Sequence, residues 1–509
     1  MGYRERSWWG WGHADEALDD AACRRLAERA LRPWLPIDGS VIPPPPDPLL
    51  PAPRLTPPPA LAETFLGDSM SRASHAYGKA FRDVVRALHG DLPNPPDLVC
   101  RPRSEPDVVA ALDWAEAAGA AVVPYGGGSS VVGGVEYRGE GPWVCLDLSR
   151  LSRIAEVDDV NRVVRVQAGV FGPALEAALE PHGLTLRHFP QSFEFSTVGG
   201  WLATRSGGHF ATGPTRIDNF VEALRVVTPR GPVESPRVPA SGAGPDANAL
   251  FLGSEGALGV IVEAWLRVQR KPAARAKATI AFPGYSQSLA ATRELVQSGL
   301  RPTNCRLLDP MEAMLNAGAT DGRARLMLGF EGPDAVHLPA ALEIVRAHGG
   351  VEIPRPPGSF REAFFRLPYT RDALVRLGLV VETVETACRW SRFEALHAAV
   401  LAAAQSAAPA GVAVVTCRFT HVYPDGPAPY FTIVTPGRRG AEVPIWDGIK
   451  AAVSDAIAAN GGTITHHHAV GRDHRPWYDE EHSPLLRATL RAAKRTLDPG
   501  GILNPGVLV

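Results

Sequence analysis

The stretch VVPYGGGSSVVGG at residues 122–134 decides the expected fold, because an apolar run ends there in three consecutive glycines followed by two serines. Consecutive glycines let the backbone curl so that several N–H groups point at one anion, which suits a diphosphate. The spacing does not match G-x-G-x-x-G, and the Lys-Ser/Thr pair of a P-loop is missing. Taken alone, the stretch fits a diphosphate cradle and a glycine turn without a ligand equally well.

Two later segments share the glycines and small hydroxyl residues of the first: HFPQSFEFSTVGGWLATRSGG at residues 188–208 and GSEGALGVI at residues 253–261. Such segments allow close backbone contact with a flat ring and a diphosphate. From about residue 96 to residue 268, short valine-rich runs alternate with helical patterns, which predicts an α+β nucleotide-binding domain. We expect strands over 121–124, 143–148, 162–168, 223–228 and 260–268, and helices over 105–118 and 171–182.

A second α+β unit follows from residue 271 to about 436, and two halves that each pair strands with helices predict a ferredoxin-like cap. A helical pattern covers residues 13–36, with Leu18, Ala22, Leu26 and Leu31 at helical spacing, and the proline-dominated stretch 41–59 predicts an extended surface connector. The predicted domains are 1–95 (helical and proline-rich), 96–270 (nucleotide-binding), 271–442 (cap) and 443–509 (mostly helical).

The composition is that of a globular enzyme rather than a disordered, fibrous or membrane-spanning protein. The residues are 45% apolar and 21% charged, which is ordinary for a globular enzyme. The length of 509 residues favours about three domains. A net charge of −2 gives no basic field for nucleic acid, and no apolar run reaches the roughly 18 residues of a membrane span. Six scattered cysteines without a C-x-x-C pair predict reduced thiols and a cytoplasmic protein, and the excess of arginine over lysine is typical of a GC-rich bacterial genome.

Three consecutive histidines, His466, His467 and His468, form a second candidate site. Because neighbours on a strand point in alternate directions, the three cannot all bind one metal with tetrahedral geometry, and we expect no metal. A polar turn remains an alternative. An anion-binding and acid–base site is favoured, since imidazole moves protons near neutral pH.

The three glycine-rich segments, in this order, resemble the FAD-binding domain of the vanillyl-alcohol oxidase / p-cresol methylhydroxylase (PCMH) superfamily. Within it, the chain is most similar to the alkyldihydroxyacetonephosphate synthase family and its bacterial relatives. The resemblance implies an α+β fold with a PCMH-type FAD-binding domain, a ferredoxin-like cap and a helical C-terminal segment. It runs over nearly the whole chain, in WWGWG (8–12), SHAYGKAF (74–81), PYGGGSS (124–130), FEFSTVGGW (193–201), CRLLD (305–309), TCRFTHVYPDGPAPYF (416–431) and NGGTITHHHAVG (460–471).

The resemblance implies FAD as cofactor, and the glycine stretch contains no histidine to attach it, so we expect FAD to be bound non-covalently. Gln191 departs from the family, which has an acidic residue there. The residues implied in FAD binding are Pro124, Tyr125, Gly126, Gly127, Gly128, Ser129, Ser130, Gln191, Ser192, Phe193, Glu194, Phe195, Ser196, Thr197, Thr204, Arg205, Ser206, Gly207, Glu255, Gly256, Ala257, Leu258, Gly259, Val260 and Ile261.

The resemblance also implies roles for residues of the later segments. Tyr430 matches the family's catalytic tyrosine, although a tyrosine in a strand is more often a core residue. Arg306 matches the arginine that binds the substrate phosphate, and Arg237 matches a further arginine that is important for activity. The triple histidine lies in the family's active site. Arg418 is a candidate without an assigned role.

The resemblance implies a reaction that exchanges the acyl group of 1-acyl-dihydroxyacetone phosphate for a long-chain alcohol, without net oxidation. His467 would remove a C1 proton with help from Tyr430, and Arg306, His466 and His468 would hold the phosphate. Oxidation of a 2-hydroxy acid on the same scaffold is the first alternative, and a flavin-binding or lipid-surface protein without activity is the second. We expect a lipid substrate, no nucleic-acid partner, a homodimer and peripheral contact with membranes.

Overall fold

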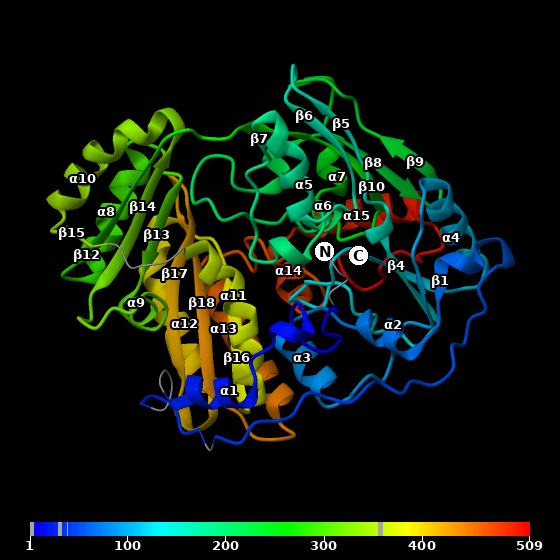
Figure 1. The fold of residues 1–509 in the computed structure, drawn as a ribbon, viewed down its shortest axis with the longest axis horizontal. Helices are drawn as coiled ribbons and strands as arrows, with labels where there is room; N and C mark the ends of the chain where they lie inside the picture. Colours follow the sequence, from blue (N-terminus) through cyan, green and yellow to red (C-terminus); the bar gives the residue numbers. More distant parts are fainter. Residues whose placement is uncertain (1–4, 29–32, 38, 355–359) are drawn as a thin grey trace.

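The computed structural model describes residues 5–28, 33–37, 39–354 and 360–509 of the 509-residue chain, and three sheets carry the fold within these ranges. A four-stranded and a five-stranded sheet form one half of the molecule. A seven-stranded sheet, which we call the cap sheet, forms the other half (Figure 1). Within the described ranges, no helix is both long and apolar enough to cross a bilayer.

The first sheet presents the glycine-rich stretch at its edge. Its order is β1-β2-β4-β3, and β2, β4 and β3 run parallel. Strands β3 and β4 are almost wholly apolar and buried, as is usual in a parallel sheet. Because β3 ends at Tyr125, the glycines begin at the carboxyl end of a parallel strand, where such sheets bind ligands. The elements are β1 (Phe65–Leu66), β2 (Leu98–Cys100), α4 (Glu105–Ala117), β3 (Ala121–Tyr125) and β4 (Trp143–Asp147).

The second sheet is antiparallel with the order β5-β6-β10-β8-β9. Helix α6 shares a hydrophobic cluster with this sheet through Val198, Trp201 and Leu202. The segments 188–208 and 253–261 are thereby brought beside the glycine-rich stretch. The elements are β5 (Ile154–Asp158), β6 (Val163–Gln167), α5 (Gly172–Leu179), α6 (Val198–Thr204), β8 (Val221–Thr228), β9 (Gly231–Glu234), α7 (Asn248–Phe251) and β10 (Val260–Arg267), with β7 (Leu184–Thr185) paired to β11 (Gln269–Arg270).

The cap sheet consists of two related halves joined edge to edge, with the order β15-β12-β14-β13-β17-β18-β16. In the first half, the four strands lie in the order 4-1-3-2 of a ferredoxin-like unit, which confirms that prediction. The second half repeats the order strand, helix, strand, strand, helix in β16, α12, β17, β18 and α13, but it lacks a fourth strand. The halves meet where Leu308 of β13 pairs with Arg418 of β17. The bounds are β12 (Arg275–Phe282), α8 (Tyr285–Gln297), β13 (Asn304–Leu308), α9 (Pro310–Ala317), β14 (Ala324–Glu331), α10 (Leu338–Ala347), β15 (Val351–Ile353), β16 (Leu379–Glu385), α12 (Trp390–Ala407), β17 (Val414–Val422), β18 (Pro427–Pro436) and α13 (Glu442–Ala459).

The C-terminal segment returns from the cap to the first sheet. After α14 (Arg475–Glu481) and α15 (Pro484–Leu497), the chain pairs with β3: the amide of Val122 donates to Ile502 O at 2.8 Å, and the amide of Asn504 donates to Val122 O at 2.8 Å. The last residues of the chain therefore support the strand that leads into the glycines.

The predicted helix over 13–36 is confirmed only in part of the described residues. A 3₁₀ turn spans Ala14–Glu16, and the helix α1 is confined to Asp20–Leu26, where the Asp19 carboxylate accepts the Ala22 amide at 2.7 Å and caps it. Leu31 lies outside the described residues. Residues 39–58 contain no helix or strand, as the prolines predict. The sequence did not reveal α11 (Phe360–Arg376), because Pro368 inside this helix reads as a break.

Candidate active site

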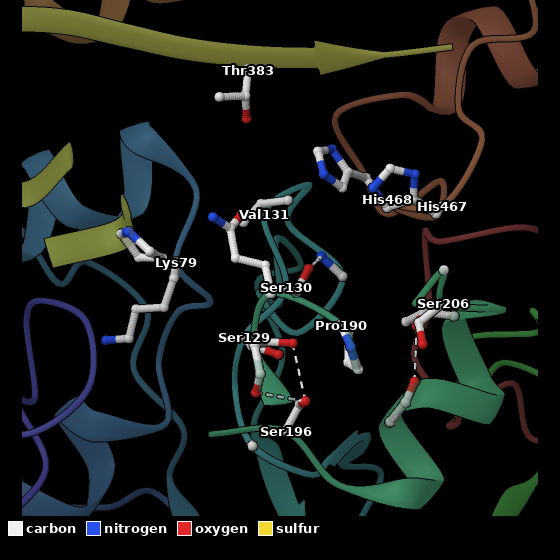
Figure 2. A pocket seen from close by; sticks show the side chains of 18 of the residues that line it. Lys79, Ser129, Ser130, Val131, Pro190, Ser196, Ser206, Thr383, His467 and His468 are labelled. Carbon is white, nitrogen blue, oxygen red and sulfur yellow. Dashed lines mark hydrogen bonds between the residues drawn. The ribbon is translucent and has the colours of Figure 1, made fainter. Parts of the chain in front are cut away.

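One large cavity lies between the glycine-rich edge of the first sheet and the face of the cap sheet. Figure 2 shows Ser129, Ser130 and Ser196 below, Thr383 of β16 above, and the rings of His467 and His468 at the right of the space that separates them. The cavity therefore joins the residues of the predicted cofactor site to those of the predicted substrate site.

The glycine loop, residues 124–134, is shaped by its lack of side chains. A Cβ atom on Gly127 would lie 1.8 Å from Phe195 O, and one on Gly126 would lie 2.3 Å from Thr197 Oγ1. Gly128 has φ +68°, in the left-handed region. The loop thus packs directly on the segment before α6, and the two backbones together form one wall of the cavity.

Most of the predicted cofactor residues line this cavity, but six of them do not. Phe193 and Phe195 are buried in hydrophobic clusters instead, Glu194 is exposed, and Arg205 pairs with Asp218 at 2.7 Å. Ala257 and Leu258 are buried without reaching the cavity. These six positions differ from the others because neighbouring side chains in extended chain and turns point in different directions. The residues that do line it are Pro124–Ser130, Gln191, Ser192, Ser196, Thr197, Thr204, Ser206, Gly207, Glu255, Gly256, Gly259, Val260 and Ile261.

The histidine loop, residues 465–472, is held by two buried carboxylates from opposite sides. Glu385 of β16 accepts the amides of His466 at 2.7 Å and His468 at 2.9 Å. Glu255 accepts the amides of Val470 and Gly471, each at 3.0 Å. The sequence did not reveal Glu385 as part of the site, since nothing in a strand sequence shows that a distant loop will bind its carboxylate.

The two carboxylates differ in their protonation. Burial raises the pKa of Glu255 to about 7. Burial also disfavours the charged form of Glu385, yet its pKa lies well below the usual value, chiefly because of its interaction with His467, which also hydrogen-bonds to it. Glu385 therefore remains ionised beneath the histidine loop.

The three consecutive histidines take different positions. His467 and His468 line the cavity, whereas His466 lies behind them with Nε2 2.7 Å from the hydroxyl of Tyr423. Burial lowers the pKa of His466 and of His468 to about 3, so both rings are neutral near pH 7. Nδ1 of His467 lies 3.2 Å from Glu385 Oε2, which leaves its Nε2 able to accept a proton.

A fourth histidine, His421 of β17, joins this cluster and was not predicted. The strand has a β-bulge between Phe419 and His421, which brings the consecutive residues Thr420 and His421 to the cavity. Burial holds the pKa of His421 well below its usual value. Ligand atoms of His421, His466 and His467 lie within 4.8 Å of one another, a grouping that could hold a metal ion.

The cap sheet presents three rows of side chains to the cavity, because every second residue of a strand shares one face. Tyr430 of β18 pairs across the strands with Arg418 of β17 and Glu385 of β16. The next two rows, two and four residues away, run across the same strands β16, β18 and β17. They consist of Thr383, Thr432 and Thr416, then Val381, Val434 and Val414. The cavity floor thus changes from charged to hydroxyl-bearing to apolar.

Two buried arginines stand at the charged end. Arg306 of β13 lines the cavity, and burial together with the nearby charge of Arg418 lowers its pKa to about 9. Its Nη2 donates to His209 O at 3.3 Å. Arg418 pairs with Glu312 at 2.8 Å. This end of the cavity therefore carries positive charge suited to an anion.

Arg237, predicted to bind substrate, lies apart from the cavity. This residue is exposed, its guanidinium lies 5.0 Å from the ring centroid of Trp265, and it does not line the cavity. Lys79 and Arg371, by contrast, line the cavity without having been predicted. The Lys79 amide donates to Ser130 O at 2.6 Å, and Arg371 Nη1 donates to Lys79 O at 2.6 Å, so both support the glycine loop.

Comparisons with known proteins agree with this arrangement. Residues 96–235 match the family described as FAD binding domain, and residues 271–508 match FAD linked oxidases, C-terminal domain. The chain is 30% identical to an alkyldihydroxyacetonephosphate synthase of Dictyostelium discoideum, over 88% of this chain and 79% of that protein. A solved alkyldihydroxyacetonephosphate synthase superposes with a TM-score of 0.82 at 25% identity, covering 98% of each chain. Solved p-cresol methylhydroxylase, with a TM-score of 0.69 at 15% identity over 88% and 94% of the chains, shares the fold.

We expect the substitution Gly127→Ala to weaken flavin binding at least about tenfold, because the new Cβ meets a backbone carbonyl that cannot move aside. Gly141→Ala, where the nearest atom lies 3.6 Å away, is the matched control. Fluorescence titration of the apoprotein with FAD measures both, with circular dichroism to check folding. A folded Gly127→Ala protein with unchanged FAD affinity would contradict the role of the glycine loop.

Proposed function

The chain belongs to the alkyldihydroxyacetonephosphate synthase family, and we propose that it exchanges the acyl group of 1-acyl-dihydroxyacetone phosphate for a long-chain alcohol. The observation that carries the proposal is the spatial order of the charged, threonine and valine rows on the cap sheet. A substrate with an anionic phosphate, ester and carbonyl oxygens and an aliphatic chain has the same order of chemistry as the charged, threonine and valine rows. A small 2-hydroxy acid has no aliphatic chain that could contact the valine row.

The apolar end of the cavity continues beyond the valines. Val381, Val414 and Val434 belong to one hydrophobic cluster with Leu374 of α11, and Leu315 of α9 packs against it. Leu315 and Leu374 also line the cavity. Each buried methylene of a chain at this end gains about 0.8 kcal/mol, which suits a fatty acyl or alkyl group.

The glycine loop fits FAD, because it offers backbone amides and no side chains where a diphosphate must approach closely. When bound, FAD supplies a ring that exchanges an electron pair with the reacting carbon. We assign to this loop and to the lining parts of residues 191–207 and 255–261 the binding of the cofactor. Arg306 holds the substrate phosphate at the charged end.

His467 is the proposed base for the C1 proton of the substrate. Its Nδ1 faces the Glu385 carboxylate, so the ring is oriented and Nε2 accepts the proton. The ring of Tyr430 stacks near His467, with 6.3 Å between the centroids and 21° between the planes. We assign to the Tyr430 hydroxyl the transfer of the proton toward the leaving carboxylate. The ring of His468, which also lines the cavity, lies 5.6 Å from that of Tyr430 with 86° between the planes.

The first experiment mixes the FAD-loaded protein anaerobically with palmitoyl-dihydroxyacetone phosphate and hexadecanol. We expect formation of the alkyl ether and release of palmitate without lasting bleaching of the flavin, while D- and L-2-hydroxy acids leave the flavin oxidised. Tyr430→Phe and His467→Ala should each lower the rate roughly 10²–10⁴-fold. Lasting bleaching by a hydroxy acid, with no ether formed, would identify a dehydrogenase instead.

We propose that FAD is bound without a covalent bond, since the glycine loop, residues 124–134, contains no histidine. Precipitation with trichloroacetic acid should therefore release the flavin into the supernatant, leaving a colourless pellet. A pellet that keeps the yellow colour after washing would show a covalent bond and would require another attachment residue.

The valine row should set the length of the chain that the cavity accepts. The substitution Val434→Phe, at a buried position facing the cavity, should lower the kcat/KM for palmitoyl substrate about tenfold or more and spare a butyryl substrate. The butyryl substrate is the internal control for folding and chemistry. An equal loss for both chain lengths would place the aliphatic chain elsewhere.

The lipid substrate implies contact with a membrane surface, and the resemblance to the family implies a homodimer; we propose both, with a cytoplasmic location. Sedimentation with lipid vesicles and analytical ultracentrifugation measure the two associations directly.

A further inference from the structure

The Glu312–Arg418 pair is buried at the charged end of the cavity, and the mechanism above does not use it. Arg418 is 4% exposed and Glu312 is 2% exposed. Arg418 Nη1 donates to Glu312 Oε1 at 2.8 Å, and the other carboxylate oxygen accepts the hydroxyl of Thr416. Burying two charges costs desolvation that their attraction rarely repays in full, so stability alone does not explain the pair.

The pair is directed at the ring of Tyr430. Arg418 and Tyr430 are direct cross-strand partners on β17 and β18, and the guanidinium carbon lies 4.0 Å from the centroid of the Tyr430 ring. A cation over an aromatic face is attracted to it, and the attraction grows when the phenol becomes an anion. Glu312 comes from α9 and accepts from the same guanidinium, which restricts its orientation.

Other groups also surround the Tyr430 ring. His467 and His468 face it from the histidine loop, and Glu385 is its cross-strand neighbour on β16. Burial raises the pKa of Tyr430, and the charges of Glu385 and Glu382 add to this. Glu382 is itself paired with Lys450 of α13 at 2.8 Å.

Two groups act in the opposite direction on the same phenol. Arg418 is the stronger of them in lowering the pKa, and a hydrogen bond with Thr383 is the weaker. The ionisation of Tyr430 therefore depends on a balance in which the buried arginine opposes burial and two carboxylates.

We propose that Arg418 and Glu312 are positioning residues for Tyr430: Glu312 fixes the guanidinium over the ring, and the guanidinium favours the ionised phenol. The inference rests on the proposed function only in that Tyr430 takes part in the reaction. Neither residue needs to touch the substrate for this role. Arg418 favours the phenolate that takes up a proton, and Glu312 limits how strongly it does so.

The test measures the ionisation of Tyr430 in the FAD-loaded protein without any substrate. The nine tyrosines are replaced by 3-fluorotyrosine, and the ¹⁹F signal that disappears in Tyr430→Phe is followed as the pH is raised. The midpoint should move to higher pH in the double variant Arg418→Met/Glu312→Leu, which removes both charges together. It should move to lower pH in Glu312→Gln, whose amide oxygen can still accept from Arg418 and hold it over the ring while the negative charge is lost.

These opposite directions separate positioning from a merely structural role. Arg165→Met is the matched control, because Arg165 also pairs with a glutamate, Glu263 at 2.7 Å, and lies 5.2 Å from the ring of Trp265 in another sheet. It should leave the Tyr430 midpoint unchanged. Movement of both test variants in the same direction, or of neither, would overturn the proposal.

The pH profile of turnover provides the second readout. Arg418→Lys keeps the charge without the planar fork, and we expect kcat to fall about tenfold with little change in KM, together with a displaced alkaline limb of the profile. An unchanged limb would overturn the assignment. If the ¹⁹F midpoints shift as expected but no ether forms, the proposed reaction fails while the role of the pair stands.

Discussion

The placement of the histidine loop between two carboxylates is the interaction on which the site depends. Glu385 belongs to the cap sheet and Glu255 to the glycine-rich part, and the same short loop donates backbone amides to both. The loop is therefore a fixed bridge whose register sets where His467 and His468 point. Because amide donors are used, the side chains of the loop remain available for chemistry. Loss of either carboxylate would release one end of the loop and leave buried amides without partners.

The architecture of the cap explains why the substrate end lies where it does. Two ferredoxin-like halves meet at β13 and β17, and Arg306 and Arg418 stand on the two strands of that junction. In a sheet without bulges, every second side chain of each strand would face the cavity, and the cavity floor would consist of regular cross-strand rows. The bulge at Phe419 and His421 breaks the alternation on β17 and adds His421 to the cavity. The junction thus concentrates cations and imidazoles, whereas the regular strands beyond it provide the threonines and valines.

The parts of the site that the sequence predicts are those whose chemistry is local. Three consecutive glycines at 126–128 permit a tightly curled backbone that other residues could not adopt here, so a loop after the apolar strand follows from the sequence. Tyr430 and Arg306 follow from the resemblance. Arg237 could not be placed, because its loop gives no pattern that fixes a direction, and the structure shows it against Trp265. Glu385 and His421 acquire their roles only through a distant loop and a bulge, which no short-range pattern encodes.

The electrostatic balance of the cavity decides what kind of ligand the imidazoles serve. His421, His466 and His467 come close enough to hold a metal ion, and the neutral rings of His421 and His466 would allow it. The positive charges of Arg306 and Arg216, however, act on His421 and help to lower its pKa. A divalent cation beside these guanidinium groups would meet the same repulsion, whereas an anion would be attracted by the arginines and could accept hydrogen bonds from the neutral rings. The balance of charge therefore favours an anionic group at the junction of the cap, with the reacting carbon between that group and the glycine loop.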